Sequence, residues 1–180
     1  MTKVVESVLI DRKDIDLMCR RVAGEISRDY AGKEILIVGV LKGAFIFLAD
    51  LVRYITVPVK VDFIAVSSYG NDTKSSGVVR INKDLDEDIT GCHVIIVEDI
   101  IDTGLTLLKL KNLLQTRGPA SLKICTAFDK PSRRTVALEP DYCGQVVPDR
   151  FVVGYGLDFN RSYRNLPDLC VLADEEDSDE

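Results

Sequence analysis

The residues best suited to chemistry lie in one short stretch, residues 98–106. It begins with two adjacent carboxylates and continues, mostly, with small and hydroxylated residues: Glu98, Asp99, Asp102, Thr103, Gly104, Leu105 and Thr106. The carboxylates can accept hydrogen bonds from a sugar diol or bind a hydrated magnesium ion. Backbone N–H groups and threonine hydroxyls at a helix start can hold a phosphate. The stretch therefore suits a sugar with a phosphate at one end and a diol at the other.

No other ligand motif in the sequence competes with this stretch. A G-x-x-x-x-G-K-[ST] phosphate loop is missing, and Gly154-Tyr155-Gly156 is followed by Phe159 where a dinucleotide-binding fingerprint has its third glycine. The simpler alternative is an ordinary capped helix with exposed acidic residues. In that alternative, Asp102 would be the N-cap.

Hydrophobic patterns indicate the elements that must position this stretch. Helical spacing, with Asp11 as the first N-cap, predicts three helices: residues 11–30, 44–53 and 106–115. Apolar or alternating runs predict four strands: residues 35–41, 57–67, 94–97 and 122–128. Since strands and helices alternate, we expect crossover connections and a mostly parallel α/β sheet with helices on both faces. Ligands bind beyond the carboxyl ends of such strands, which is where residues 98–106 lie.

The pattern becomes irregular after residue 130. Two short β-like pieces, residues 151–153 and 170–172, predict a small hood subdomain over the carboxyl edge of the sheet, formed mainly by residues 130–173. A chain of 180 residues fits one domain, which we expect to cover residues 1–173. Residues 174–180 carry six acidic groups and no cation, which predicts a disordered tail.

That tail accounts for the formal net charge of −6, so the body of the protein is close to neutral. We therefore expect neither a nucleic-acid-binding face nor a polybasic membrane patch. The five cysteines are widely spaced without a C-x-x-C pair, and the first residues lack a long apolar signal segment. These features predict a cytoplasmic protein with reduced thiols.

The sequence VIIVEDIIDTGLT at residues 94–106 closely resembles the phosphoribosyl-diphosphate motif of type I phosphoribosyltransferases, in the form of the hypoxanthine-guanine branch. The resemblance spans nearly the whole chain, from LKGA at Leu41 through SSYG at Ser67 to GYGLDFNRSYR at Gly154. It implies the type I fold, a mostly parallel twisted sheet flanked by helices, with a small hood. It also implies transfer of a phosphoribosyl group to hypoxanthine or guanine, with xanthine as a further candidate, and magnesium as cofactor.

The resemblance assigns roles within residues 98–106. Asp102 would be the general base that removes the purine N7 proton. Glu98 and Asp99 would bind the ribose hydroxyls and favour magnesium. The 5′-phosphate would be held mainly by backbone donors of four residues: Thr103, Gly104, Leu105 and Thr106. Many relatives carry lysine where this chain has Leu105, so one cationic contact is absent.

Lys42, Gly43 and Arg164 match the family's pyrophosphate ligands. Relatives often have a cis peptide bond before this lysine. A guanidinium at position 164 could grip two phosphate oxygens. The alternatives are a solvated lysine at a strand end and an ordinary exposed arginine.

The resemblance assigns the purine to four residues: Lys130, Phe151, Val152 and Asp158. Lys130 would donate to O6 and so select 6-oxopurines over adenine. Phe151 would stack on the base, Val152 would read its edge through main-chain groups, and Asp158 would bind a second magnesium ion. The alternatives are a solvated lysine, core packing of the FVV triplet, and a surface acid.

The motif at Ser68 and Tyr69 resembles a lid that excludes water from the reacting sugar. The expected partners are phosphoribosyl diphosphate, a 6-oxopurine, and further copies of the chain in a homodimer or homotetramer. Two other readings stay open. One is a transferase for another base, and the other is a regulator with this fold that binds the sugar diphosphate and nucleic acid without catalysis.

Overall fold

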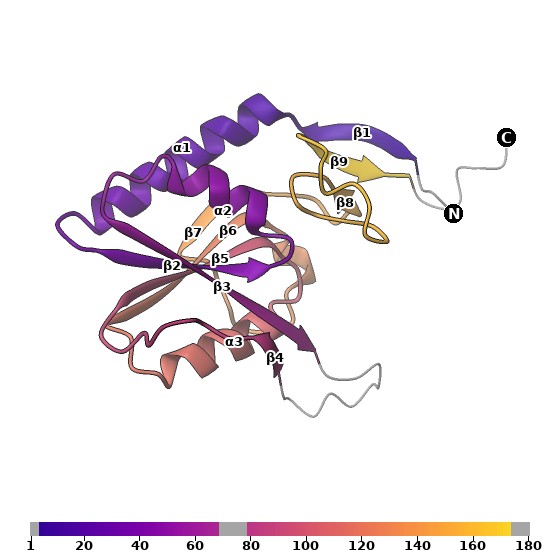
Figure 1. The fold of residues 1–180 in the computed structure, drawn as a ribbon. Helices are drawn as coiled ribbons and strands as arrows, with labels where there is room; N and C mark the ends of the chain where they lie inside the picture. Colours follow the sequence, from indigo (N-terminus) through magenta and orange to yellow (C-terminus); the bar gives the residue numbers. More distant parts are fainter. Residues whose placement is uncertain (1–3, 69–78, 174–180) are drawn as a thin grey trace, which may run out of the picture.

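The computed structural model describes residues 4–68 and 79–173, and Figure 1 shows two sheets of different size. The larger sheet contains, in spatial order, β4 (Val79–Lys83), β3 (Val59–Ser68), β2 (Ile35–Leu41), β5 (His93–Ile101), β6 (Ser121–Asp129) and β7 (Tyr142–Val146). Its neighbours are parallel except for β3 and β4, which confirms the predicted mostly parallel sheet. The smaller, antiparallel sheet contains β1 (Val5–Ile10), β9 (Leu169–Leu172) and β8 (Val152–Val153).

Helices cover both faces of the larger sheet, as Figure 1 shows. The helices α1 (Arg12–Asp29) and α2 (Phe45–Val52) pack on one face, and α3 (Leu105–Gln115) packs on the other. The carboxylate of Asp11 accepts hydrogen bonds from the N–H groups of Lys13 and Asp14, at 2.8 and 2.9 Å. Asp11 is therefore the N-cap of α1, as predicted.

The boundaries around the chemical stretch differ from the prediction. Strand β5 does not end at residue 97 but continues to Ile101, because it stays paired with β6 up to Ile101 opposite Asp129. Glu98 and Asp99 are thus in the strand, and the turn begins at Asp102. Helix α3 begins at Leu105, and its N-cap is Gly104 rather than Asp102. The alternative in which Asp102 caps the helix is therefore wrong.

Three strands were not predicted from the sequence: β1, β4 and β7. Since β1 pairs with β9, the hood includes the N-terminal strand as well as the C-terminal part of the chain. Apolar and polar residues alternate in β3, which suggests a buried Val61 and an exposed Asp62. The structure shows the opposite, because Val61 is 44% exposed and Asp62 is buried. The Asp62 carboxylate tolerates burial because it accepts a hydrogen bond from the N–H of Asp86, at 2.8 Å, and pairs with Lys83.

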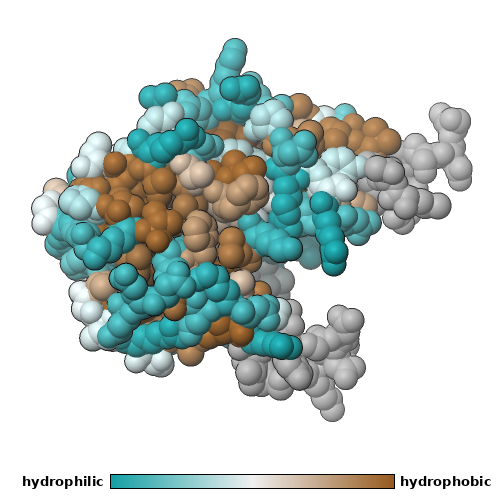
Figure 2. Space-filling model, in the orientation of Figure 1, coloured by the Kyte–Doolittle hydropathy of each residue, from teal (hydrophilic) through white to brown (hydrophobic). Residues whose placement is uncertain are grey.

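An apolar patch lies on one face of the molecule (Figure 2). Figure 2 shows hydrophobic side chains gathered over α2 and the adjoining part of β3, where Phe45 and Val61 are each 44% exposed.

All five cysteines are free thiols, and three of them are buried. Among the described residues, no helix has the length and apolar character needed to cross a membrane.

Candidate active site

Three neighbouring cavities open beyond the carboxyl ends of β5 and β6, and Asp102 lines all of them. The first, of about 160 Å³, is lined by Glu98 and residues 100–107. The second, of about 220 Å³, is lined by Asp99 and by the four residues predicted to bind the purine: Lys130, Phe151, Val152 and Asp158. The third, of about 260 Å³, extends from Lys130 to Arg133 and Asp149. The fold thus brings together the predicted phosphate and purine residues.

Asp102 begins the turn between β5 and α3. Its side chain is 47% exposed, yet its Oδ1 atom is buried and lies 3.4 Å from Nε of Arg133 without a hydrogen bond. Within the described part of the chain, this oxygen is the one buried side-chain nitrogen or oxygen without a hydrogen-bond partner. Such an atom costs free energy until a donor reaches it. The geometry is therefore compatible with an acceptor for the proton of a bound base.

The loop from Asp102 to α3 forms an anion cradle. Gly104 has a left-handed φ of 79°, which glycine adopts without strain. It offers no side-chain acceptor to the helix, and the N–H of Leu105 makes only a long contact of 3.4 Å with Oγ1 of Thr103. The helix start therefore presents backbone donors and a positive dipole end to an anion.

Glu98 and Asp99 are consecutive residues of β5, so their side chains leave the strand on opposite faces. Glu98 lines the cavity beside the anion cradle, and Asp99 lines the cavity beside Lys130. Burial raises the pKa of both carboxyl groups, and the negative charge of Asp99 raises the pKa of Glu98 further. A cation or sugar hydroxyls beside them would favour their charged forms.

Lys130 follows β6 and is only 6% exposed. Its Nζ atom donates to the carbonyl oxygen of Arg150 at 2.7 Å, so the alternative of a solvated lysine is wrong. Phe151 is 47% exposed, and its ring lies edge-on to Phe159 with centroids 5.5 Å apart. Val152 is buried. The alternative of core packing is thus correct for the side chain of Val152 but not for Phe151. The exposed part of the Phe151 ring can contact an aromatic ligand.

The turn after β2 brings Lys42 and Gly43 to the carboxylates. The Leu41–Lys42 peptide bond is cis, which the sequence alone left open. A Cβ atom on Gly43 would lie 1.6 Å from Oδ2 of Asp99, and a Cβ atom on Gly156 would lie 2.2 Å from the carbonyl oxygen of Gly43. The turn is therefore enclosed on both sides, while Lys42 itself is exposed.

Arg164 and Asp158 lie together. Nη2 of Arg164 is 2.8 Å from Oδ1 of Asp158, and Nη1 donates to the carbonyl oxygen of Gly156 at 2.6 Å. Oδ2 of Asp158 accepts from the N–H of Arg161 at 2.9 Å. Both side chains are less than one third exposed, which contradicts the alternatives of a free surface acid and an ordinary exposed arginine.

Known proteins resemble this chain along most of its length. A family model for the phosphoribosyl transferase domain matches residues 10–160. A hypoxanthine-guanine phosphoribosyltransferase of Streptococcus pneumoniae is 46% identical over 171 residues, 95% of each chain. The chain belongs to the hypoxanthine-guanine phosphoribosyltransferase family.

Other members of the family agree with this assignment. A hypoxanthine phosphoribosyltransferase of Haemophilus influenzae is 48% identical over 179 residues, covering 98% of this chain and all of the relative. The crystal structure of a hypoxanthine-guanine phosphoribosyltransferase of Bacillus anthracis has a TM-score of 0.91 and 46% identity, and the match covers 94% of this chain and 100% of that one. The predicted type I fold is thus confirmed.

Two family features concern individual residues of the site. Ser68 is the last residue of β3, and Tyr69 lies outside the described residues, so their assignment to a lid stays a prediction. Leu105, which stands where many family members carry lysine, has a 37% exposed side chain. The cradle therefore depends on backbone donors at this position.

Several site residues were missed by sequence analysis. Arg133 pairs with Asp102 and, at 3.6 Å, with Asp149. Arg134 forms a buried ion pair with Asp129, the last residue of β6. Their only sequence signal is a pair of consecutive arginines soon after Lys130. Exposed arginines are common in proteins, so this pair alone predicts no role.

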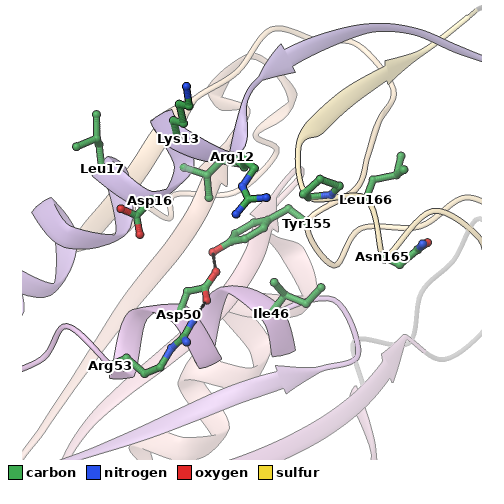
Figure 3. Close-up of a pocket in the computed structure, with 12 residues that line it drawn as sticks. Arg12, Lys13, Asp16, Leu17, Ile46, Asp50, Arg53, Tyr155, Asn165 and Leu166 are labelled. Atoms are coloured by element: carbon green, nitrogen blue, oxygen red, sulfur yellow. Dashed lines mark hydrogen bonds and ion pairs between the residues drawn. The ribbon is translucent and has the colours of Figure 1, made fainter.

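A larger cavity, of about 750 Å³, lies elsewhere, between α1, α2 and the hood (Figure 3). The Tyr155 hydroxyl donates to Oδ2 of Asp50 at 2.8 Å beside it. The predicted site residues do not line this cavity. We therefore assign the chemistry to the smaller cavities around Asp102, because they combine carboxylates, a buried lysine and an anion cradle.

Proposed function

We propose that this chain transfers the 5-phosphoribosyl group of phosphoribosyl diphosphate to hypoxanthine or guanine, forming IMP or GMP and pyrophosphate. The observation that carries the proposal is the position of Asp102 between an anion cradle and a cavity lined by Lys130 and Phe151. A sugar phosphate held in the cradle would present its anomeric carbon to a base held in the cavity. Xanthine is a further acceptor in this proposal.

Three contacts would hold the purine. The ammonium of Lys130 would donate to O6, and Phe151 would stack on the ring, as its exposed face allows. The main chain of Val152 would contact the edge of the base. Asp102 would then accept the N7 proton through Oδ1, which forms no hydrogen bond in the structure, and loss of this proton makes the purine a better nucleophile as it attacks the anomeric carbon.

The sugar diphosphate would be held at both ends. Backbone N–H groups of residues 103–106 would bind the 5′-phosphate, and Glu98 and Asp99 would accept hydrogen bonds from the ribose hydroxyls. Lys42, the Gly43 backbone and Arg164 would neutralise the departing pyrophosphate. For this, Arg164 has to leave its ion pair with Asp158 or share it with the phosphate oxygens.

Magnesium is the proposed cofactor, with Glu98 and Asp99 favouring one ion and Asp158 as a ligand of a second. Among the described residues, no group of three or more metal-binding side chains forms a closed cage. Magnesium does not need one, since it is usually bound by one or two carboxylates together with substrate phosphates and water. The adjacent, half-buried carboxylates of Glu98 and Asp99 fit that donor set. When bound, the ion would neutralise pyrophosphate charge and orient the sugar.

Assays of the purified protein with hypoxanthine, guanine, xanthine, adenine and uracil test the proposed function directly. We expect turnover with hypoxanthine and guanine in the presence of phosphoribosyl diphosphate and magnesium. Activity confined to adenine or uracil would favour a transferase for another base. Binding of the sugar diphosphate without turnover on any base would favour the non-catalytic regulator.

Replacing Lys130 with methionine should weaken use of 6-oxopurines. A hydrogen bond from a charged donor is worth about 1.5–3 kcal/mol, so kcat/KM for hypoxanthine and guanine should fall by roughly 10- to 150-fold. Adenine cannot accept this hydrogen bond at its 6-amino group, so any residual adenine turnover should change less. Lys123→Met is a matched control, because Lys123 lies at the opposite end of β6. Equal losses for hypoxanthine and adenine would contradict the O6 assignment.

We also propose that the protein assembles as a homodimer or homotetramer. The support is the apolar surface over α2 and β3, where large side chains such as Phe45 and Val61 stay exposed in the single chain. Exposed apolar patches of this kind often mark protein interfaces. Neither Phe45 nor Val61 is among the residues proposed to bind the base or the sugar.

A further inference from the structure

A buried arginine connects the two groups that would act on the purine. The side chain of Arg134 is only 8% exposed, and it donates to three acceptors on different segments. Nη2 donates to the carboxylate of Asp129, Nη1 donates to the carbonyl oxygen of Asp102 at 2.8 Å, and Nε donates to the carbonyl oxygen of Leu138 at 2.9 Å. One guanidinium thus spans the end of β6 and the turn after β5.

Two of these acceptors, on Asp129 and Asp102, are next to a group proposed to act on the base. Asp129 immediately precedes Lys130, and its carboxylate is 4% exposed, so it cannot exchange this partner for water without cost. The Asp102 carbonyl belongs to the residue that would accept the N7 proton. Arg134 therefore ties together the backbone positions from which the O6 donor and the N7 acceptor project.

The backbone around Arg134 reinforces this connection. Three consecutive carbonyl oxygens, those of residues 101, 102 and 103, accept hydrogen bonds from the segment after β6. The N–H of Lys130 donates to the first at 3.0 Å, Arg134 donates to the second, and the N–H of Thr135 donates to the third at 3.1 Å. Only the middle bond is made by a side chain, so a substitution at position 134 can remove it and leave both neighbours in place.

We propose that Arg134 is a positioning residue that fixes the distance between the Asp102 carboxylate and the Lys130 ammonium. O6 and N7 are adjacent on a purine, so both contacts form together only if this distance is held closely. Arg134 does not touch the substrate in this proposal and acts through Asp102 and Lys130. The inference rests on the proposed function, in which those two residues contact the base.

Arg134→Lys is the direct test, because lysine keeps the charge but cannot reach three acceptors at once. A misplacement of about 1 Å at a reacting group can cost on the order of 100-fold in rate, so kcat should fall by roughly 10- to 100-fold. The KM for phosphoribosyl diphosphate should change little, because only the reacting geometry is disturbed. Arg117→Lys is the matched control, since Arg117 also forms an ion pair with an aspartate, donating two hydrogen bonds to the carboxylate of Asp84. Arg117 does not line the cavities around Asp102.

A second variant and a double variant separate positioning from folding. Asp129→Asn keeps the shape of the partner and should lower kcat in the same direction, which preserves the test if Arg134→Lys does not fold. In an Asp102→Asn background, Arg134→Lys should cause little further loss, because residues that act through one another are not additive. The midpoint temperature of thermal unfolding should fall for both arginine variants. The kcat per active site should fall only for Arg134→Lys.

The outcomes distinguish a failure of the proposed function from a failure of the positioning role of Arg134. Absence of transfer to hypoxanthine or guanine by the wild-type protein would refute the proposed function itself. With wild-type turnover present, the positioning role is overturned if Arg134→Lys lowers kcat no more than Arg117→Lys does. It is also overturned if its effect is fully additive with Asp102→Asn.

Discussion

Replacing Asp102 with asparagine should lower kcat by about 100- to 10,000-fold, the usual contribution of a general base. Asparagine has the same shape, so the turn and the anion cradle should keep their geometry. The amide cannot take up the N7 proton, whereas the carboxylate of Asp102 can, and its Oδ1 forms no hydrogen bond in the structure. Binding of phosphoribosyl diphosphate should stay close to the wild-type level, because the backbone donors of residues 103–106 are unaffected. Steady-state kinetics and calorimetric titration measure the two effects separately.

Asp88→Asn is a suitable control for that experiment. Asp88 is exposed and bonds only locally, accepting from the N–H and the hydroxyl of Thr90. The control should retain wild-type kcat. If Asp102→Asn also kept wild-type kcat, Asp102 could not be the base, and the proton would have to leave the purine by another route.

Replacing Gly43 with alanine should lower kcat/KM by at least about 100-fold. The new Cβ atom would lie 1.6 Å from Oδ2 of Asp99, far inside contact distance, so either the turn or the carboxylate has to move. The turn carries Lys42 and Gly43, which are proposed pyrophosphate ligands, and Asp99 is a proposed ribose ligand. Movement of either the turn or the carboxylate would therefore disturb binding of the sugar diphosphate. The loss should therefore appear in KM for phosphoribosyl diphosphate as well as in kcat.

Gly24→Ala provides the matched glycine control. Gly24 is exposed in the middle of α1, and a Cβ atom there would meet no atom within 4 Å. Alanine should raise the free energy of unfolding by about 0.5–1 kcal/mol, because glycine loses more backbone freedom in a helix. Its kinetics should match the wild type. A folded Gly43→Ala variant with wild-type kinetics would mean that Asp99 can move away from the turn without consequence.

The sequence predicted the central elements well because local pattern and burial agree there. The run in β2 is buried between neighbours on both sides, and α1 has a capping aspartate and helical apolar spacing. By contrast, β1, β4 and β7 are strands at the edges of the two sheets. The sequences VESVLI and YCGQV lack clear alternation, and VRINK is only five residues long, so pairing with a partner decides their conformation.

The candidate site was predictable where a motif is continuous in sequence and not where distant segments meet. Residues 98–106 carry a specific motif, so the cradle and the Asp102 carboxylate could be anticipated. The contact of Gly43 with Asp99 joins segments more than fifty residues apart, and no spacing rule reveals it. Arg134 is likewise inconspicuous in the sequence, because burial and three acceptors become visible only in the folded chain.

The pairing of β1 with β9 bears on how the protein matures during synthesis. The register joins Val5 to Leu172, so nearly the whole chain separates the two partners. Residues 5–172 must therefore all leave the ribosome before this small sheet can close, whereas every strand of the larger sheet, the last of which ends at Val146, has already emerged. Nascent chains should pass through a stage in which the larger sheet has formed and β1 has not yet paired with β9. Such late, long-range pairing is slow.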